Sequence, residues 1–96
     1  PQAVSTEGPS LRFFGSAYGL SDKINDIALD STGVLWVGTV DGLGRYDGRG
    51  FTFLRRVAGA PDSLPDNAIA ALHVDANDRV WMATWGGLVR YDPVQT

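Results

Sequence analysis

A repeat with a period of 45 residues constrains the fold of this chain more than any other feature of its sequence. Shifting the sequence by 45 positions aligns residues 24–47 with residues 69–92. Nine aligned pairs are identical: Ile24/Ile69, Asp30/Asp75, Trp36/Trp81, Thr39/Thr84, Gly42/Gly87, Leu43/Leu88, Arg45/Arg90, Tyr46/Tyr91 and Asp47/Asp92. A repeat of this length is typical of proteins in which each copy is one small structural unit and neighbouring units bury one another's apolar faces.

Each copy contains strand-length runs separated by turn residues. We expect strands at residues 24–29, 34–39, 43–47 and 51–56 in the first copy, and at residues 69–74, 79–84 and 88–92 in the second. Turn residues follow the first strand of each copy, and Asp41-Gly42 and Gly86-Gly87 favour tight hairpins after the second. Consecutive strands of a copy should therefore pair in antiparallel fashion.

Both faces of the expected sheets are apolar. In residues 34–39 the alternating pairs Val34/Trp36 and Leu35/Val37 are all hydrophobic, whereas a sheet with one face in water alternates between apolar and polar residues. Four-stranded antiparallel units that repeat every ~40–45 residues with a recurring tryptophan are typical of β-propeller blades. We therefore predict an all-β fold of two four-stranded antiparallel propeller blades, with a two-layer sandwich as the alternative.

The repeat also sets the expected boundaries. We expect a flexible lead-in at residues 1–10, the outer strand of a preceding blade at 11–15, a first blade at 20–56 and a second blade at 64–92 that lacks its outer strand. Two blades cannot close a ring, which takes about six to eight. The chain should thus be a fragment of a larger propeller, or should form one by associating with further copies of itself.

Charge and composition exclude several classes of partner. Eight Lys and Arg against eleven Asp and Glu give a net charge of -3, so there is no basic stripe for a nucleic acid. No stretch approaches the ~20 apolar residues of a membrane-spanning helix, and we expect no membrane contact by this segment. Cysteine is absent, which excludes disulfides, thiolate metal sites and cysteine nucleophiles.

We interpret the recurring residues as architecture. The tryptophans should pack between blades, the threonines and glycines should form hairpins and the aspartates should cap turns; the residues concerned are Trp36, Trp81, Thr39, Thr84, Gly42, Gly87, Tyr46, Tyr91, Asp30 and Asp75. Asp75, Asn77 and Asp78 lie close together, but Ca²⁺ takes six to eight oxygen ligands at wider spacing. We therefore predict no metal and no cofactor.

Positions that differ between the copies are the candidates for ligand binding. Trp85 replaces Val40, Asp41 is replaced by Gly86, and His73 replaces Ala28. Ligand specificity can also reside in two further differences, which are Asn25 and Asp26 against Ala70 and Ala71, and the insertion at residues 58–63. No Ser/His/Asp grouping, phosphate loop or metal-ligand cluster occurs at motif spacing, so we do not expect this chain to be an enzyme.

The residues of both copies resemble the two-component regulator propeller repeat. The resemblance rests on Asp30-x-x-Gly33-x-Leu35-Trp36-Val37-Gly38-Thr39, on Asp41-Gly42-Leu43-x-Arg45-Tyr46-Asp47, and on the second copy from Leu64 to Asp92. In that copy Asp78 replaces the turn glycine. Proteins of this family typically carry an extracytoplasmic propeller sensor, one membrane helix and an intracellular histidine kinase or diguanylate cyclase.

Two functions follow from the resemblance. The first is a non-catalytic, periplasmic sensor module of a bacterial transmembrane receptor that binds a saccharide or peptide. The alternative is a non-signalling propeller scaffold that binds protein or glycan. The gene sequence after Thr96 distinguishes them, because further repeats, a membrane helix and a kinase or cyclase would favour the sensor.

Overall fold

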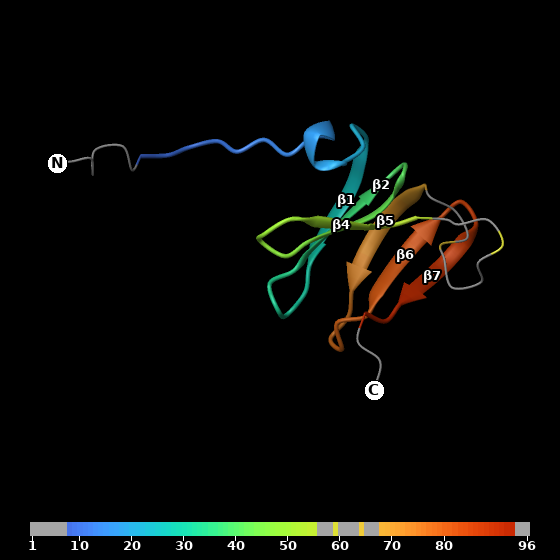
Figure 1. Ribbon diagram of the computed structural model, residues 1–96. Coiled ribbons are helices and arrows are strands. Elements are labelled where there is room, and N and C mark those ends of the chain that lie inside the picture. The colour runs from blue at the N-terminus through green and yellow to red at the C-terminus, as the bar shows by residue number, and fades with distance from the viewer. Residues whose placement is uncertain (1–7, 56–58, 60–63, 65–67, 94–96) are drawn as a thin grey trace.

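Two antiparallel sheets stand side by side in the computed structural model, one from each copy of the repeat (Figure 1). The structure describes residues 8–55, 59, 64 and 68–93. The first sheet has the order β1-β2-β3-β4, with β1 (Ile24–Leu29), β2 (Leu35–Thr39), β3 (Gly42–Tyr46) and β4 (Phe51–Leu54). The second has the order β5-β6-β7, with β5 (Ile69–Val74), β6 (Val80–Thr84) and β7 (Gly87–Tyr91). A short 3-10 helix, η2 (Ser16–Tyr18), precedes the first sheet.

The all-β prediction of two antiparallel blades is confirmed, with one correction to its details. The second sheet has three strands among the described residues, and the lack of an outer strand in the second blade stays a prediction. Residues 11–15 form no strand, because a strand needs the edge of another sheet to pair with and the described residues offer none there. Their assignment to a preceding blade stays a prediction, and residue 56, expected at the end of β4, lies outside the described residues.

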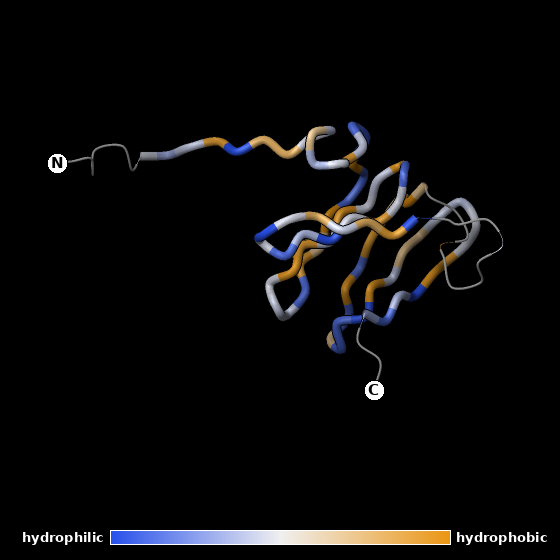
Figure 2. The backbone as a smooth tube through the Cα atoms, viewed as in Figure 1, coloured by the Kyte–Doolittle hydropathy of each residue, from blue (hydrophilic) through white to orange (hydrophobic). Residues whose placement is uncertain are grey.

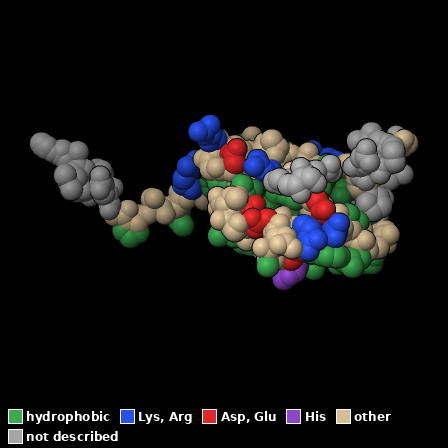
Figure 3. Space-filling model, turned by 90° about the horizontal axis from the view of Figure 1, so that it is seen from below, with side chains coloured by type: hydrophobic (Ala, Val, Ile, Leu, Met, Phe, Trp, Pro, Cys, Tyr) green, Lys and Arg blue, Asp and Glu red, His purple; other side chains and the backbone are tan. Residues whose placement is uncertain are grey.

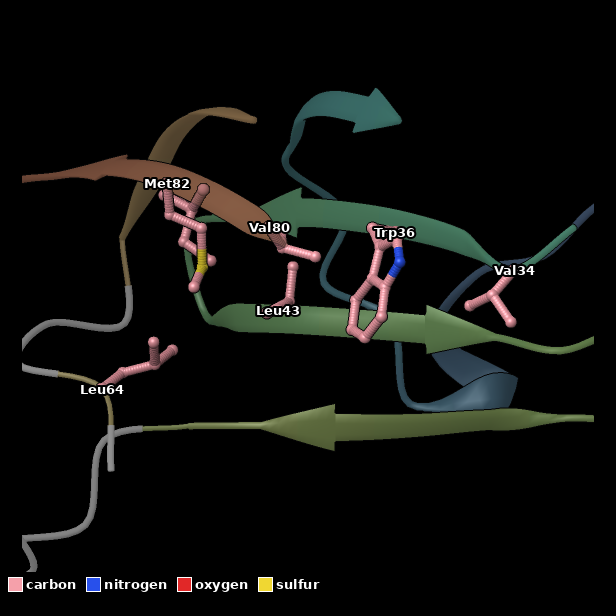
Figure 4. Close-up of a cluster of buried hydrophobic side chains, with 7 residues drawn as sticks. Val34, Trp36, Leu43, Leu64, Val80 and Met82 are labelled. Carbon is pink, nitrogen blue, oxygen red and sulfur yellow. The ribbon is translucent and has the colours of Figure 1, made fainter. Parts of the chain in front are cut away.

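The hydrophobic core lies between the two blades. Trp36 and Leu43 of the first sheet meet Ile69, Val80 and Met82 of the second, and all five are nearly inaccessible to water (Figure 4). Hydrophobic residues concentrate in the strands and hydrophilic ones in the turns (Figure 2). The two sheets therefore stabilise each other chiefly by burying apolar area.

Gly38 lets the two sheets approach closely. A Cβ atom at this position would lie 2.8 Å from Cγ2 of Ile69 and 3.2 Å from Cγ of Leu72. Both distances are shorter than ordinary carbon contacts of about 3.5–4.0 Å. The absence of a side chain at residue 38 thus allows β5 to pack directly against β2.

Three pairs of residues form hydrogen bonds across the same junction. The Asn25 side-chain amide donates to the Ile69 carbonyl at 2.8 Å, and the Leu72 N–H donates to the Asp26 carboxylate at 2.8 Å. At one end of the junction, the Ser31 N–H donates to the Asp78 carboxylate at 2.9 Å. Asn25 lies at a break in the β1–β2 register, and such bulges redirect side chains. Apolar packing and hydrogen bonds together fix the position of one blade relative to the other.

We predict that Gly38→Ala destabilises the chain. Relieving the contact with Ile69 requires the sheets to separate or β2 to distort, and overpacking of this kind costs about 1–3 kcal/mol of unfolding free energy. Urea unfolding followed by tryptophan fluorescence measures the change. Gly50→Ala is the matched control, because a Cβ at residue 50 meets nothing within 4 Å. Equal stability of the two variants would contradict the close approach.

Candidate functional site

Asp30 and Asp75 organise equivalent turns in the two blades. Asp30 Oδ1 accepts hydrogen bonds from the N–H groups of Thr32 at 2.9 Å and Val34 at 3.0 Å. Asp75 Oδ1 accepts from the N–H groups of Asn77 at 2.9 Å and Arg79 at 3.0 Å. Carboxylates placed in this way satisfy turn N–H groups that have no strand partner.

Each of these carboxylates also binds the tryptophan of its own blade. The Trp36 indole N–H donates to Asp30 Oδ2 at 3.1 Å, and the Trp81 indole N–H donates to Asp75 Oδ2 at 2.9 Å. The link was not predicted from the sequence, from which we expected the aspartates to cap turns and the tryptophans to pack between blades. The available signal was that both pairs recur at the same six-residue spacing.

Hydrogen bonding lowers the pKa of both turn carboxyls. For Asp75 the main cause is the indole of Trp81; partial burial opposes it, and N–H groups of Arg79 and Asn77 lower the pKa further. For Asp30, burial is the largest single influence and would raise the pKa, but hydrogen bonds from Thr32, Trp36 and Val34 together outweigh it. Both groups are therefore ionised at neutral pH.

Thr39 and Thr84 shape the two hairpins that carry candidate ligand-binding residues. Thr39 Oγ1 donates to the Gly42 carbonyl and accepts from the Asp41 N–H, both at 2.9 Å. Thr84 Oγ1 donates to the Gly87 carbonyl at 2.7 Å and accepts from the Gly86 N–H at 3.1 Å. Gly42 and Gly87 have φ of 118° and 124°, which other residues rarely adopt. The hairpins are thus rigid platforms for residues 40–41 and 85–86.

The structure separates the three predicted ligand-binding residues. Trp85 is 82% exposed in the β6–β7 hairpin. Asp41 occupies the equivalent hairpin of the first blade, where its carboxylate lies 3.3 Å from Nε of Arg55. His73 pairs with Trp81 near the other end of its sheet, so it cannot share a small ligand with Trp85. Residues 58 and 60–63 of the insertion lie outside the described residues.

Asn25 and Asp26, which we expected to contribute to specificity, instead face the second blade. Both make the hydrogen bonds to β5 described above. The equivalent residues Ala70 and Ala71 have no side-chain group that could make such hydrogen bonds. The difference between the copies therefore reflects the contact of the first blade with the second.

A cleft of about 280 Å³ opens at one end of the junction between the blades. Its lining comes from both blades and comprises Asp30, Thr32, Val34, Trp36, Arg45, Asp78, Tyr91 and Pro93. Asp30 is engaged by the turn and by Trp36, and the Trp36 and Tyr91 rings pack edge to face at 5.8 Å. Because half of the lining consists of recurring residues, the same cleft should form wherever two such blades meet, which favours a structural role.

No group of three or more His, Asp or Glu side chains within the described residues is arranged to hold a metal ion. Within those same residues, no helix has the length and apolar character needed to cross a membrane.

The repeat sequence matches a known family. The sequence profile of the two component regulator propeller family matches residues 18–41 and residues 63–86. The two matches are 45 residues apart, which is the period of the repeat. A search of curated proteins finds no match.

Solved structures with similar folds are extracellular domains from B. thetaiotaomicron. The domain assigned to the hybrid two component system BT3049 is 27% identical with a TM-score of 0.75, over 83% of this chain and 12% of that one. The corresponding domain of BT4673 is 27% identical with a TM-score of 0.67, over 76% of this chain and 10% of that one. The present chain thus spans about a tenth of the length of these relatives.

We predict that the turn carboxylates make stability fall in acid. The pKa of Asp75 is lowered in the folded chain, whereas an unfolded aspartate has a pKa of about 3.9. Its stabilising contribution is therefore complete above about pH 4 and is lost as the pH falls towards the folded pKa. Asp75→Asn removes this titration, so its Tm should fall less than that of the wild type between about pH 6 and about pH 2.

Circular dichroism melts at a series of pH values measure the effect. Trp81→Phe is the matched control, because it keeps an aromatic ring but removes the indole N–H that binds Asp75. Its Tm should also depend less steeply on acid. If the Tm of Asp75→Asn fell in acid as much as that of the wild type, this carboxylate would not contribute to the pH dependence of stability.

Proposed function

Because this chain belongs to the two component regulator propeller family, we propose that it forms part of a non-catalytic, ligand-sensing propeller on the extracytoplasmic side of a bacterial signalling receptor. The observation that carries the proposal is that each family match covers the first two strands of one of the two adjacent blades. The similar solved structures are extracellular domains of two component systems. Kinase or cyclase chemistry would belong to an output domain elsewhere in such a receptor.

The geometry favours the hairpin end of the blades as the ligand-binding end. The β2–β3 and β6–β7 hairpins are built alike, yet residue 40 is valine and residue 85 is tryptophan. Residues that maintain the fold recur in both copies, so a large residue that occurs in one copy and is exposed there is not needed for the hairpin. Recognition of a ligand accounts for it better.

Trp85 suits a saccharide or a peptide. An exposed indole offers a flat apolar face, on which the C–H face of a sugar or a peptide side chain can pack, and an N–H that can donate to a hydroxyl or carbonyl. Asp41 is less available, because its carboxylate and carbonyl both accept from Arg55. We therefore assign the first ligand contact to Trp85 and a secondary role to the Asp41 hairpin.

Thermal stabilisation by a panel of saccharides and peptides tests the proposal. A ligand that binds only the folded chain at about 100 times its Kd should stabilise it by about 2.7 kcal/mol. Trp85→Val should abolish the shift without unfolding the chain, since valine occupies the equivalent position 40. Val40→Ala is the control and should retain the shift. Equal stabilisation of wild type and Trp85→Val would place the ligand elsewhere, and no stabilisation by any compound would favour the scaffold alternative.

A further inference from the structure

The β5–β6 turn of the second blade has an aspartate where the first blade has a glycine. The two turns are built alike, because the Gly33 N–H donates to the Asp30 carbonyl at 3.2 Å and the Asp78 N–H donates to the Asp75 carbonyl at 3.0 Å. The backbone φ is 90° at residue 33 and 59° at residue 78. Among the residues that the structure describes, Asp78 is the only one other than glycine with a positive φ. The turn thus imposes on Asp78 a conformation that glycine adopts at a lower cost.

The contacts of the Asp78 side chain explain why an aspartate occupies this position. Its carboxylate accepts one hydrogen bond from the Ser31 N–H at 2.9 Å and another from the Ser31 hydroxyl. Ser31 lies in the β1–β2 turn of the other blade, and the second copy has Ala76 at the equivalent position. Both partners are therefore residues that only one copy of the repeat has. The pair is an addition to the repeat and not one of its recurring contacts.

The pair borders the cleft between the blades. Asp78 lines that cleft, as do Thr32, which follows Ser31, and the rings of Trp36 and Tyr91. Trp36 is 2% exposed, so water hardly reaches it. The β1–β2 and β5–β6 turns lie at the lower edge of Figure 1, and Figure 3 views the molecule from that side, where acidic and basic side chains lie close together. The two hydrogen bonds to Asp78 thus join the blades at the end where the cleft opens.

We propose that Ser31 and Asp78 form a latch, which holds the turn ends of the two blades together and keeps the cleft beside Trp36 closed to water. The other contacts described across the junction meet β5 at Ile69 and Leu72, whereas residue 78 lies beyond the end of that strand. When the latch opens, these contacts remain as a hinge about which the second blade can turn. The cleft then widens at the turn end.

Opposing effects allow the latch to open without unfolding the chain. Two hydrogen bonds to a carboxylate stabilise the closed form, whereas the positive φ of Asp78 has a cost that glycine would not incur. Water also competes for the carboxylate, since Ser31 is exposed. The net stabilisation is therefore small, and local opening requires much less free energy than global unfolding. The latch is a conformational device that does not depend on the proposed sensing function.

Hydrogen exchange measured by NMR tests the latch. Asp78→Gly removes the acceptor and supplies the residue that the first copy has at position 33. The Ser31 amide should then exchange roughly five- to thirtyfold faster, as expected for the loss of a hydrogen bond to a carboxylate. The indole N–H of Trp36 should also exchange faster, because the cleft admits water. The urea midpoint of the whole chain should shift little, since relief of the positive φ offsets the lost bonds.

Ser31→Ala tests the other half of the latch. It removes the hydroxyl but keeps the N–H that donates to Asp78, so the Trp36 indole should exchange faster than in the wild type and more slowly than in Asp78→Gly. Combining the two changes should add nothing to Asp78→Gly alone, because residues that act as one pair are not additive. Asn77→Ala is the matched control and should exchange like the wild type, since residue 77 binds Asp75 through its backbone N–H.

Three results would overturn the proposal. The first is a Ser31 amide that exchanges as fast in the wild type as in Asp78→Gly. The second is unchanged exchange of the Trp36 indole in Asp78→Gly. The third is a loss of global stability in Asp78→Gly that accounts for all of the faster exchange, because Asp78 would then only support the fold.

Asp78→Asn keeps the test decisive if Asp78→Gly does not fold. Asparagine tolerates a positive φ and keeps one acceptor oxygen, so the exchange rate of the Ser31 amide should rise above that of the wild type. Exchange of that amide at the wild-type rate in Asp78→Asn would contradict the latch. None of these measurements uses a ligand, so their outcome is separate from the test of the sensing function.

Discussion

The close approach of β5 to β2 at Gly38 is the contact on which the rest of the structure depends. It brings Ile69 and Leu72 against the first sheet, which closes the core around Trp36 and Met82. The same approach brings Asn25 and Asp26 within 2.8 Å of the β5 backbone. A three- or four-stranded sheet with two apolar faces is a poor independent unit in water. Each blade is therefore stabilised by its neighbour.

Within each blade, one aspartate joins the turn to the packing between sheets. Asp30 holds its turn through backbone N–H groups and orients Trp36 through its indole, and Asp75 does the same for Trp81. Local structure and inter-blade packing are thus coupled by one hydrogen-bonded side chain. The two environments differ in one respect: Trp36 is buried by the second blade, whereas Trp81 is only partly buried.

Much of the fold could be predicted because the signals are local or repeated. The predicted bounds of β1 and β5 agree with the observed ones at every residue. The predicted starts of the other strands differ from the observed starts by one position or less. The contacts across the junction could not be predicted. Asn25 and Asp26 differ from their equivalents in the second copy. We interpreted such differences as candidates for ligand specificity, but these two residues bind β5 across the junction between the blades. Trp85 and His73 both differ from their equivalents, but the distance between them depends on strand register, which the alignment of two copies does not reveal.

The exchange rate of the Leu72 backbone amide tests the central claim most directly. Leu72 lies on β5, the edge strand of its sheet, and its N–H donates to Asp26 of the other blade. If the blades pack as described, NMR should find this amide protected to the level of the paired β5–β6 amides, and Asp26→Ala should accelerate its exchange about tenfold or more, the effect of losing a hydrogen bond worth roughly 1.4 kcal/mol. Rapid exchange in the wild type, as expected of a free edge, would contradict the account.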